Sequence, residues 1–183
     1  PQQPAIIAGQ DLQAGGTWLG ITRQGRFAAV TNYRNPNSVE GTISRGTLCT
    51  DFLASDTSCL DYLSQIQQHK NQYSGFNLLL DDGNDFYYYS NTQNQITKLA
   101  AGYYGLSNAF LNTSWPKTTG GVNALKHAQS HDDLINLLMD KTLPPDSELP
   151  NTDIGIATER LLAPRFIQSE QYGTRASTAL SIG

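Results

Sequence analysis

The alternation of hydrophobic and polar residues predicts strands that are grouped in hairpins. Residues 17–21 and 26–30 are two such runs, and Gly25 between them supplies the turn of a β-hairpin. Residues 76–80 and 86–89, separated by turn-forming residues, predict a second hairpin. Shorter strands are expected at residues 4–9, 95–100, 103–108, 165–168 and 172–180.

Hydrophobic residues three or four positions apart predict two helices between the hairpins. Ser44 is expected to cap a short helix in which Leu48 and Phe52 share a face. Thr57 is expected to cap an amphipathic helix that packs on a sheet. The apolar face of that helix is expected to contain Leu60, Leu63 and Ile66.

Helix start signals predict two further helices after the strands. Pro116 is suited to the first position of a helix that runs to residue 125. Ser130 and Asp133 have the spacing of a capping box ahead of several leucines. A helical turn is expected at residues 159–162. Because strands cluster in hairpins and helices are grouped between them, the order indicates an antiparallel α+β layered domain.

Composition narrows the class of protein. The 183 residues carry a formal net charge of -4, which argues against nucleic-acid binding. No apolar run approaches the roughly 20 residues of a membrane-spanning helix. The two cysteines do not form a disulfide scaffold, so we expect one soluble domain in the cytoplasm.

Two asparagines at predicted strand ends are candidates for a catalytic role. Asn32 follows Thr31 and Asn108 follows Ser107, each at the end of a predicted strand. Side-chain amides that face a developing oxyanion stabilise it in acyl transfer. The structural alternative is that each asparagine holds a turn by bonding its own backbone.

Three arginines and several aromatic residues are candidates for ligand binding. Arg34, Arg45 and Arg175 lie in polar or glycine-rich surroundings, where a guanidinium can hold a carboxylate. Arg175 could equally be an exposed strand residue. Trp18 and Tyr33 could line a pocket for an apolar or planar ligand, although such residues are more often core.

The histidines and cysteines do not predict a metal site. His127 and His131 are four residues apart, but a helix cap at Ser130 would separate their faces. Cys49 and Cys59 fall on predicted helices beside apolar residues, where buried thiols are common.

Seven segments in order resemble the NRDE-domain family, also called the transport and Golgi organisation protein 2 family. They are Gly16–Gly20, Thr31–Arg34, Ser44–Gly46, Tyr73–Leu78, Gly105–Asn108, Trp115–Lys117 and Tyr172–Arg175. The resemblance runs from about residue 9 to the end.

The resemblance implies a fold similar to N-terminal-nucleophile hydrolases, a four-layer αββα sandwich with two antiparallel sheets. It also implies one domain, residues 1–183, that starts after the N-terminal strand with the Met-Cys and Asn-Arg-Asp-Glu motifs of the family and lacks the end of its C-terminal strand. By similarity to bile-salt hydrolases and penicillin acylases, Asn32 and Asn108 would take oxyanion-stabilising positions. Arg175 would match a late strand arginine.

Family members are associated with haem trafficking and lipid homeostasis, which implies a binding protein with no required cofactor. The ligand would be haem or an acyl compound, held between Asn108, Arg175 and an edge lined by Trp18, Tyr33, Arg34, Arg45 and Ser107. One alternative is an amide hydrolase whose N-terminal Cys precedes Pro1. Another is a scaffold for a protein partner, such as one that receives haem.

Overall fold

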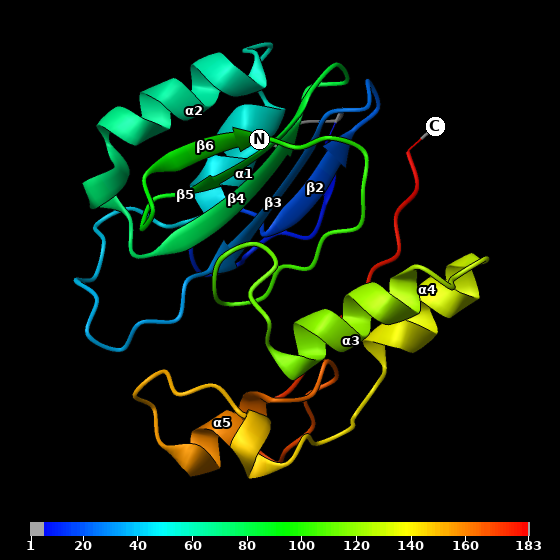
Figure 1. Ribbon diagram of the computed structural model, residues 1–183. Helices are drawn as coiled ribbons and strands as arrows, with labels where there is room; N and C mark the ends of the chain where they lie inside the picture. The colour runs from blue at the N-terminus through cyan, green and yellow to red at the C-terminus, as the bar shows by residue number, and fades with distance from the viewer. Residues whose placement is uncertain (1–5, 183) are drawn as a thin grey trace. The chain divides into compact units, whose positions relative to one another are not determined.

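The first half of the chain builds one antiparallel sheet. The computed structural model describes residues 6–182, and in it six strands follow one another as a meander in which every neighbouring pair is antiparallel (Figure 1). The strands are β1 (Ile6–Ala8), β2 (Leu19–Thr22), β3 (Phe27–Asn32), β4 (Phe76–Asp81), β5 (Phe86–Ser90) and β6 (Gln95–Lys98). The α+β class and both predicted hairpins are confirmed. Residues 4 and 5 of the first predicted strand lie outside the described residues.

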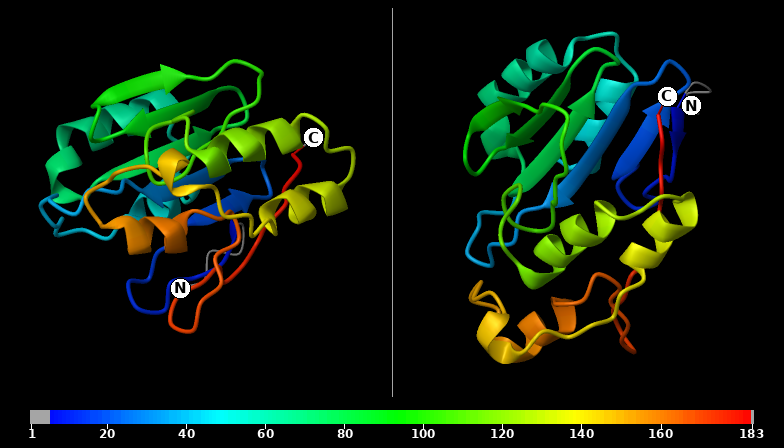
Figure 2. Two further views of the ribbon diagram at one scale, coloured as in Figure 1. Left: turned by 60° about the horizontal axis from the view of Figure 1, so that its bottom comes forward. Right: turned by 45° about the vertical axis from the view of Figure 1, so that its right-hand side comes forward.

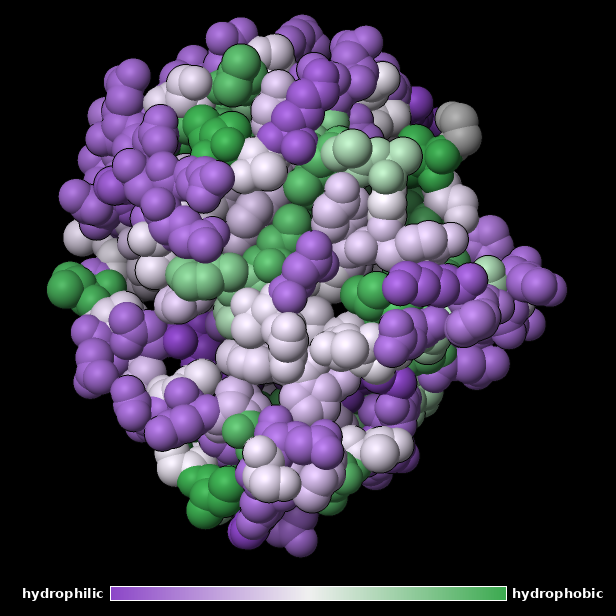
Figure 3. Space-filling view, in the orientation of Figure 1, coloured by the Kyte–Doolittle hydropathy of each residue, from purple (hydrophilic) through white to green (hydrophobic). Residues whose placement is uncertain are grey.

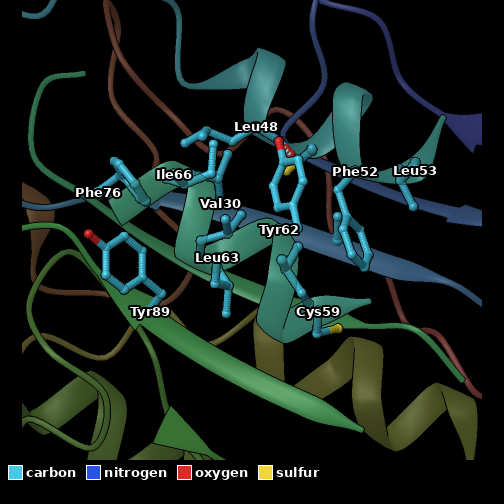
Figure 4. Packing of buried hydrophobic residues seen from close by; sticks show 14 residues of the cluster. Val30, Leu48, Phe52, Leu53, Cys59, Tyr62, Leu63, Ile66, Phe76 and Tyr89 are labelled. Atoms are coloured by element: carbon cyan, nitrogen blue, oxygen red, sulfur yellow. Dashed lines mark hydrogen bonds between the residues drawn. The ribbon is translucent and has the colours of Figure 1, made fainter. Parts of the chain in front are cut away.

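Helices α1 (Gly46–Leu53) and α2 (Cys59–Gln68) pack against one face of this sheet, and the 3-10 helix η1 (Lys70–Gln72) follows them. Register places Ala28 opposite Leu80, and Val30 opposite Leu78, so these side chains point to the same face. They meet Leu63 and other helix residues in the buried cluster shown in Figure 4. Burial of this apolar surface is the main stabilising contribution to the fold.

The other face of the sheet is also partly apolar. Ile7, Leu19 and Phe27 point to it, because register pairs Ile7 with Ile21, Ile21 with Phe27, and Leu19 with Ala29. Ile7 is 57% exposed and Leu19 is 39% exposed. Figure 3 shows hydrophobic residues along the strands on the face turned to the viewer.

The chain divides into two compact units. The first unit contains the sheet with α1 and α2, together with Asn108–Phe110; the second contains Tyr103–Ser107 and the chain from Leu111 onward. The second unit (Figure 2) is formed by α3 (Pro116–Leu125), α4 (His131–Leu138), the 3-10 helix η2 (Asp146–Glu148) and α5 (Ile156–Leu162). No helix within residues 6–182 has the length and hydrophobicity needed to cross a membrane.

The predicted helix starts in the second unit are confirmed. Pro116 occupies the first turn of α3. Ser130 caps α4: its side chain accepts from the Asp133 N–H at 3.1 Å, and the Asp133 carboxylate accepts from the Ser130 N–H at 3.0 Å. The predicted helical turn at residues 159–162 is part of α5.

The two cap predictions in the first unit are wrong by one residue. Ser58, not Thr57, caps α2 and accepts from the Asp61 N–H at 3.1 Å. Arg45, not Ser44, is the N-cap residue of α1, although the Ser44 hydroxyl accepts from the Gly46 N–H at 3.3 Å. The cap position depends on which residue adopts an extended or helical backbone, and several polar neighbours are chemically able to serve.

Two predicted strand regions are not strands. Residues 103–108 form a loop, because Gly105 exchanges hydrogen bonds with Asn112 instead of with a neighbouring strand. The pair predicted at 165–168 and 172–180 is reduced to a single bridge between Gln168 and Gly173. There the Ile167 N–H donates to the Thr174 hydroxyl at 3.0 Å, which interrupts the ladder.

Within residues 6–182 all six strands belong to one open sheet. The described part of the chain therefore shows the α+β class with helices on one sheet face. It does not show the second sheet of the predicted four-layer sandwich.

Candidate functional site

The end of β3 brings the two candidate asparagines together. The Asn108 side chain donates to the backbone oxygen of Asn32 at 3.2 Å, and the Arg34 N–H donates to the Asn108 backbone oxygen at 2.7 Å. These bonds place Asn108–Phe110 beside the end of β3, although the two asparagines are 76 residues apart. The predicted strand at residues 103–108 does not form, so Asn108 reaches this place from a loop.

The two asparagines differ in the hydrogen bonds of their side chains. The Asn108 amide is used in a structural bond to the β3 backbone 76 residues away, and not in the local bond to its own backbone that the turn-holding alternative expects. The side-chain oxygen of Asn32 is buried and has no hydrogen-bond partner within residues 6–182. Such a buried acceptor is costly unless it is satisfied by a ligand or water. Of the two asparagines, Asn32 is therefore the better candidate for contact with a ligand.

Arg45 is joined to the same region through Gly75, and Trp18 lies beside Arg45. The Gly75 backbone oxygen accepts from the Arg45 guanidinium at 3.1 Å and from the Tyr33 N–H at 2.9 Å. The Arg45 guanidinium lies 5.7 Å from the centre of the Trp18 ring, within cation-π range. A side chain at Gly75 would crowd Tyr33, since an added Cβ would lie 3.2 Å from the Tyr33 Cβ.

Aromatic surface and positive charge meet in this cluster. The Tyr33 ring stacks on Phe110 with 4.7 Å between ring centres, and Trp18 is 40% exposed. Burial lowers the pKa of Arg45 from its ordinary value, but a guanidinium remains charged at neutral pH. We call Trp18, Asn32, Tyr33, Arg34, Arg45 and Asn108 the β3 cluster.

Asn77 supports the cluster and was not predicted as important. Its amide donates to the Thr31 hydroxyl at 3.2 Å and to the Ala109 backbone oxygen at 2.9 Å, and its side-chain oxygen accepts from Tyr88 at 2.7 Å. Asn77 is fully buried. An asparagine inside an otherwise hydrophobic strand was the only sequence indication, because buried polar residues need dedicated partners.

Ser107 and Arg175 belong to the second unit. Ser107 lines a cleft beside α3. Arg175 is exposed and follows the single bridge at Gly173, so the predicted strand around it is absent. Its predicted convergence with Asn32 and Asn108 stays a prediction.

Neither cysteine is suited to act as a nucleophile. Cys49 and Cys59 are both fully buried and outside any disulfide. Burial raises the pKa of Cys49 to about 12, and it also raises the pKa of Cys59, where the Asp82 carboxylate adds to the effect. A thiol needs its thiolate form for nucleophilic attack. Within residues 6–182 no group of three His, Cys, Asp or Glu side chains is placed to hold a metal ion.

Comparison with known proteins gives one consistent result. The family described as Transport and Golgi organisation 2 matches residues 1–183. The chain is 32% identical over 199 residues to a Transport and Golgi organization protein 2 homolog of Bos taurus. It is 33% identical over 199 residues to the homolog of Homo sapiens. Both alignments cover 97% of this chain and 72% of the relative.

Proposed function

The chain belongs to the Transport and Golgi organisation 2 family, and from this membership we propose that it binds and carries an amphipathic ligand, with haem as the leading candidate. The observation that carries the proposal is the buried, unpartnered side-chain oxygen of Asn32 at the end of β3, where the chain continues into Tyr33 and Arg34 and Asn108 lies beside the strand. Haem combines a planar apolar body with carboxylates, which are the two features that such a cluster can recognise.

Each part of the β3 cluster has a role in this proposal. Trp18 and Tyr33 provide flat apolar surface for the body of the ligand. Arg34 and Arg45 would pair with its carboxylates, since a guanidinium binds a carboxylate through two parallel hydrogen bonds. The Asn32 amide NH2 can donate to a ligand carboxylate at the end of β3, whereas the unpartnered side-chain oxygen is an acceptor and needs a donor, such as a water bound with the ligand. An acyl compound would meet the same chemistry.

Haem titration of the full chain tests the proposal. We expect the Soret band to shift on binding, and Arg34→Ala to weaken the apparent affinity about tenfold because a charge-assisted hydrogen bond is lost. Asn32→Ala is expected to weaken binding as well. That variant keeps the backbone oxygen that accepts from Asn108, so the local fold is retained.

Arg23→Ala is the matched control, because Arg23 is an exposed arginine in the turn before β3, at the other end of the strand from Asn32. Its titration curve should equal that of the unchanged chain. A Soret band that does not shift, or that shifts with the same affinity in all three variants, would contradict haem binding at the β3 cluster.

The proposal includes the finer fold expected of the family, a four-layer sandwich in which a second sheet covers the open sheet face. Ile7 and Leu19 point to that face and are partly exposed, which supports the proposal because apolar side chains on a sheet face are usually covered. We also expect the protein to act in the cytoplasm, where its two buried thiols would stay reduced.

A further inference from the structure

A second candidate site lies entirely within the second unit, in a cleft beside helices α3 and α4. These helices pack against each other, and both views of Figure 2 show them as neighbours. The cleft has a volume of about 480 Å³, which is within the range of roughly 300–1,000 Å³ typical of small-molecule sites. Residues 178–180 of the C-terminal segment line it as well.

Most of the cleft wall is aliphatic. Val122 and Leu125 of α3 contribute to it together with Leu134, Leu137 and Leu138 of α4. The leucine spacing on α4 explains why this face is apolar although the helix is not part of the buried core of the first unit. Such a wall favours a hydrocarbon chain over a polar ligand.

One end of the cleft is polar and positively charged. Lys117 and Thr118, in the first turn of α3, both line it. Thr118 is only 9% exposed, and its hydroxyl is buried without a hydrogen-bond partner in the described part of the chain. An unsatisfied buried hydroxyl at a cleft wall points to a ligand that supplies the missing bond.

The charged residues that line the cleft favour a negatively charged ligand. Lys117 and Arg165 are the charged residues among the described lining residues, and both are cationic. Arg165 is balanced by its ion pair with Asp140. Lys117 donates to the Leu162 backbone oxygen at 2.7 Å, and its ammonium brings a positive charge to the cleft. The first turn of a helix also favours an anion.

We propose that this cleft binds an aliphatic carboxylate of medium chain length. Its carboxylate lies at the first turn of α3, where it accepts from Lys117 and Thr118. Its hydrocarbon chain follows Val122 and Leu125 between the two helices. This site shares no residue with the β3 cluster, so it is independent of the function proposed above.

Calorimetric titration of the full chain with decanoate tests this site. We expect one saturable binding event that Lys117→Met weakens at least tenfold, because the substitution removes the charge and keeps the apolar stem. Lys126→Met is the matched control, since Lys126 is exposed at the end of the same helix and does not line the cleft. That control should leave the affinity unchanged.

Gly121→Leu fills the cleft and should abolish decanoate binding. Gly121 lines the cleft in the middle of α3, and an added Cβ would make an ordinary contact of 3.4 Å with the Arg165 Cδ. Leucine also favours the helix more than glycine does, so the fold should be retained. Circular dichroism of the variant checks that point.

Three results would overturn the proposal: no binding of decanoate, binding that survives Gly121→Leu, or decan-1-ol binding as tightly as decanoate. Haem titration of Gly121→Leu separates the two sites, because the Soret response should persist in this variant. If Gly121→Leu fails to fold, the site is tested by NMR in the unchanged chain, as the shifts that decanoate induces in the leucine methyl resonances. Shifts confined to leucines outside the cleft would refute the site.

Discussion

Asp82, in the turn between β4 and β5, shows how a single carboxylate connects two elements. One of its oxygens accepts from the Cys59 N–H at 2.8 Å, at the start of α2. The other accepts from the N–H groups of Asn84 and Asp85, both at 3.1 Å. Partial burial alone would raise the pKa of Asp82, but these hydrogen bonds outweigh it and hold the pKa below its ordinary value.

Asp82→Ala is expected to lower the free energy of unfolding at neutral pH by about 1–3 kcal/mol, since it removes hydrogen bonds to a charged group at a helix N-terminus. A carboxylate whose pKa is lower in the folded chain stabilises the fold above its unfolded pKa of about 3.9. That contribution disappears as the pH falls through the folded pKa. Urea unfolding at neutral pH and at about pH 2 should therefore show a large and then a small difference.

Asp56→Ala provides the comparison, because Asp56 is an exposed aspartate in the loop before α2. It should change the stability little at either pH. Equal losses for Asp82→Ala and Asp56→Ala at neutral pH would show that the Asp82 bonds do not stabilise the fold. The sequence identifies Asp82 only as one of several turn residues, and its bond to Cys59 depends on the placement of α2.

At the scale of the element, α2 shows the limit of pattern analysis. Its existence and amphipathic character are predictable, because buried residues recur with helical spacing, although its predicted cap is wrong by one residue. The residues of its buried face are only partly predictable. Leu63 is fully buried and Ile66 is 9% exposed, whereas Leu60 is 49% exposed. Cys59 and Tyr62 take the place expected for Leu60. The Tyr62 hydroxyl is accommodated by donating to the Leu48 backbone oxygen at 2.9 Å (Figure 4).

Two alanine variants of α2 test this assignment. Leu63→Ala should lower the free energy of unfolding by about 2–5 kcal/mol, because it leaves a cavity in the buried cluster. Leu60→Ala makes the same chemical change on the exposed side and should cost less than about 1 kcal/mol. Denaturant unfolding of both variants measures the difference. A cost for Leu60→Ala as large as that for Leu63→Ala would contradict the observed orientation of the helix.

At the scale of the whole chain, the hydrophobic core is unevenly distributed. Every residue of the buried hydrophobic cluster found in residues 6–182 belongs to the first unit. In the second unit the buried positions include Ala163 and the polar residues Thr118 and Glu159. Local stability follows the density of buried apolar contacts, so the two units should differ in how easily they open.

Hydrogen exchange measures this difference. Backbone amides of β3 and β4 should exchange most slowly, because they lie at the centre of the sheet and beneath the buried cluster. Amides of α3, α4 and α5 should exchange faster by at least tenfold, corresponding to an opening free energy lower by about 1.4 kcal/mol or more. Equal protection in the two units would contradict an uneven core.

The sequence by itself determined the local elements of this protein. Alternating apolar residues defined the two hairpins, Pro116 and the Ser130 capping box defined the starts of α3 and α4, and the quoted motifs indicated the family. These features depend on interactions between residues close in the chain, which propensity and periodicity record directly. For the same reason the predicted strand at residues 103–108 failed, because a strand exists only where a partner strand accepts its hydrogen bonds.

Only the tertiary structure decided which distant residues meet. It placed Asn108 beside Asn32, joined Arg45 to Tyr33 through the Gly75 carbonyl, and left the Asn32 and Thr118 side-chain oxygens buried without partners. Each of these outcomes depends on how packed elements exclude water and on which acceptors remain within reach. Neither quantity is encoded in the spacing of residues along the chain, so the hydrogen bonds of the β3 cluster and the cleft beside α3 became visible only in the folded protein.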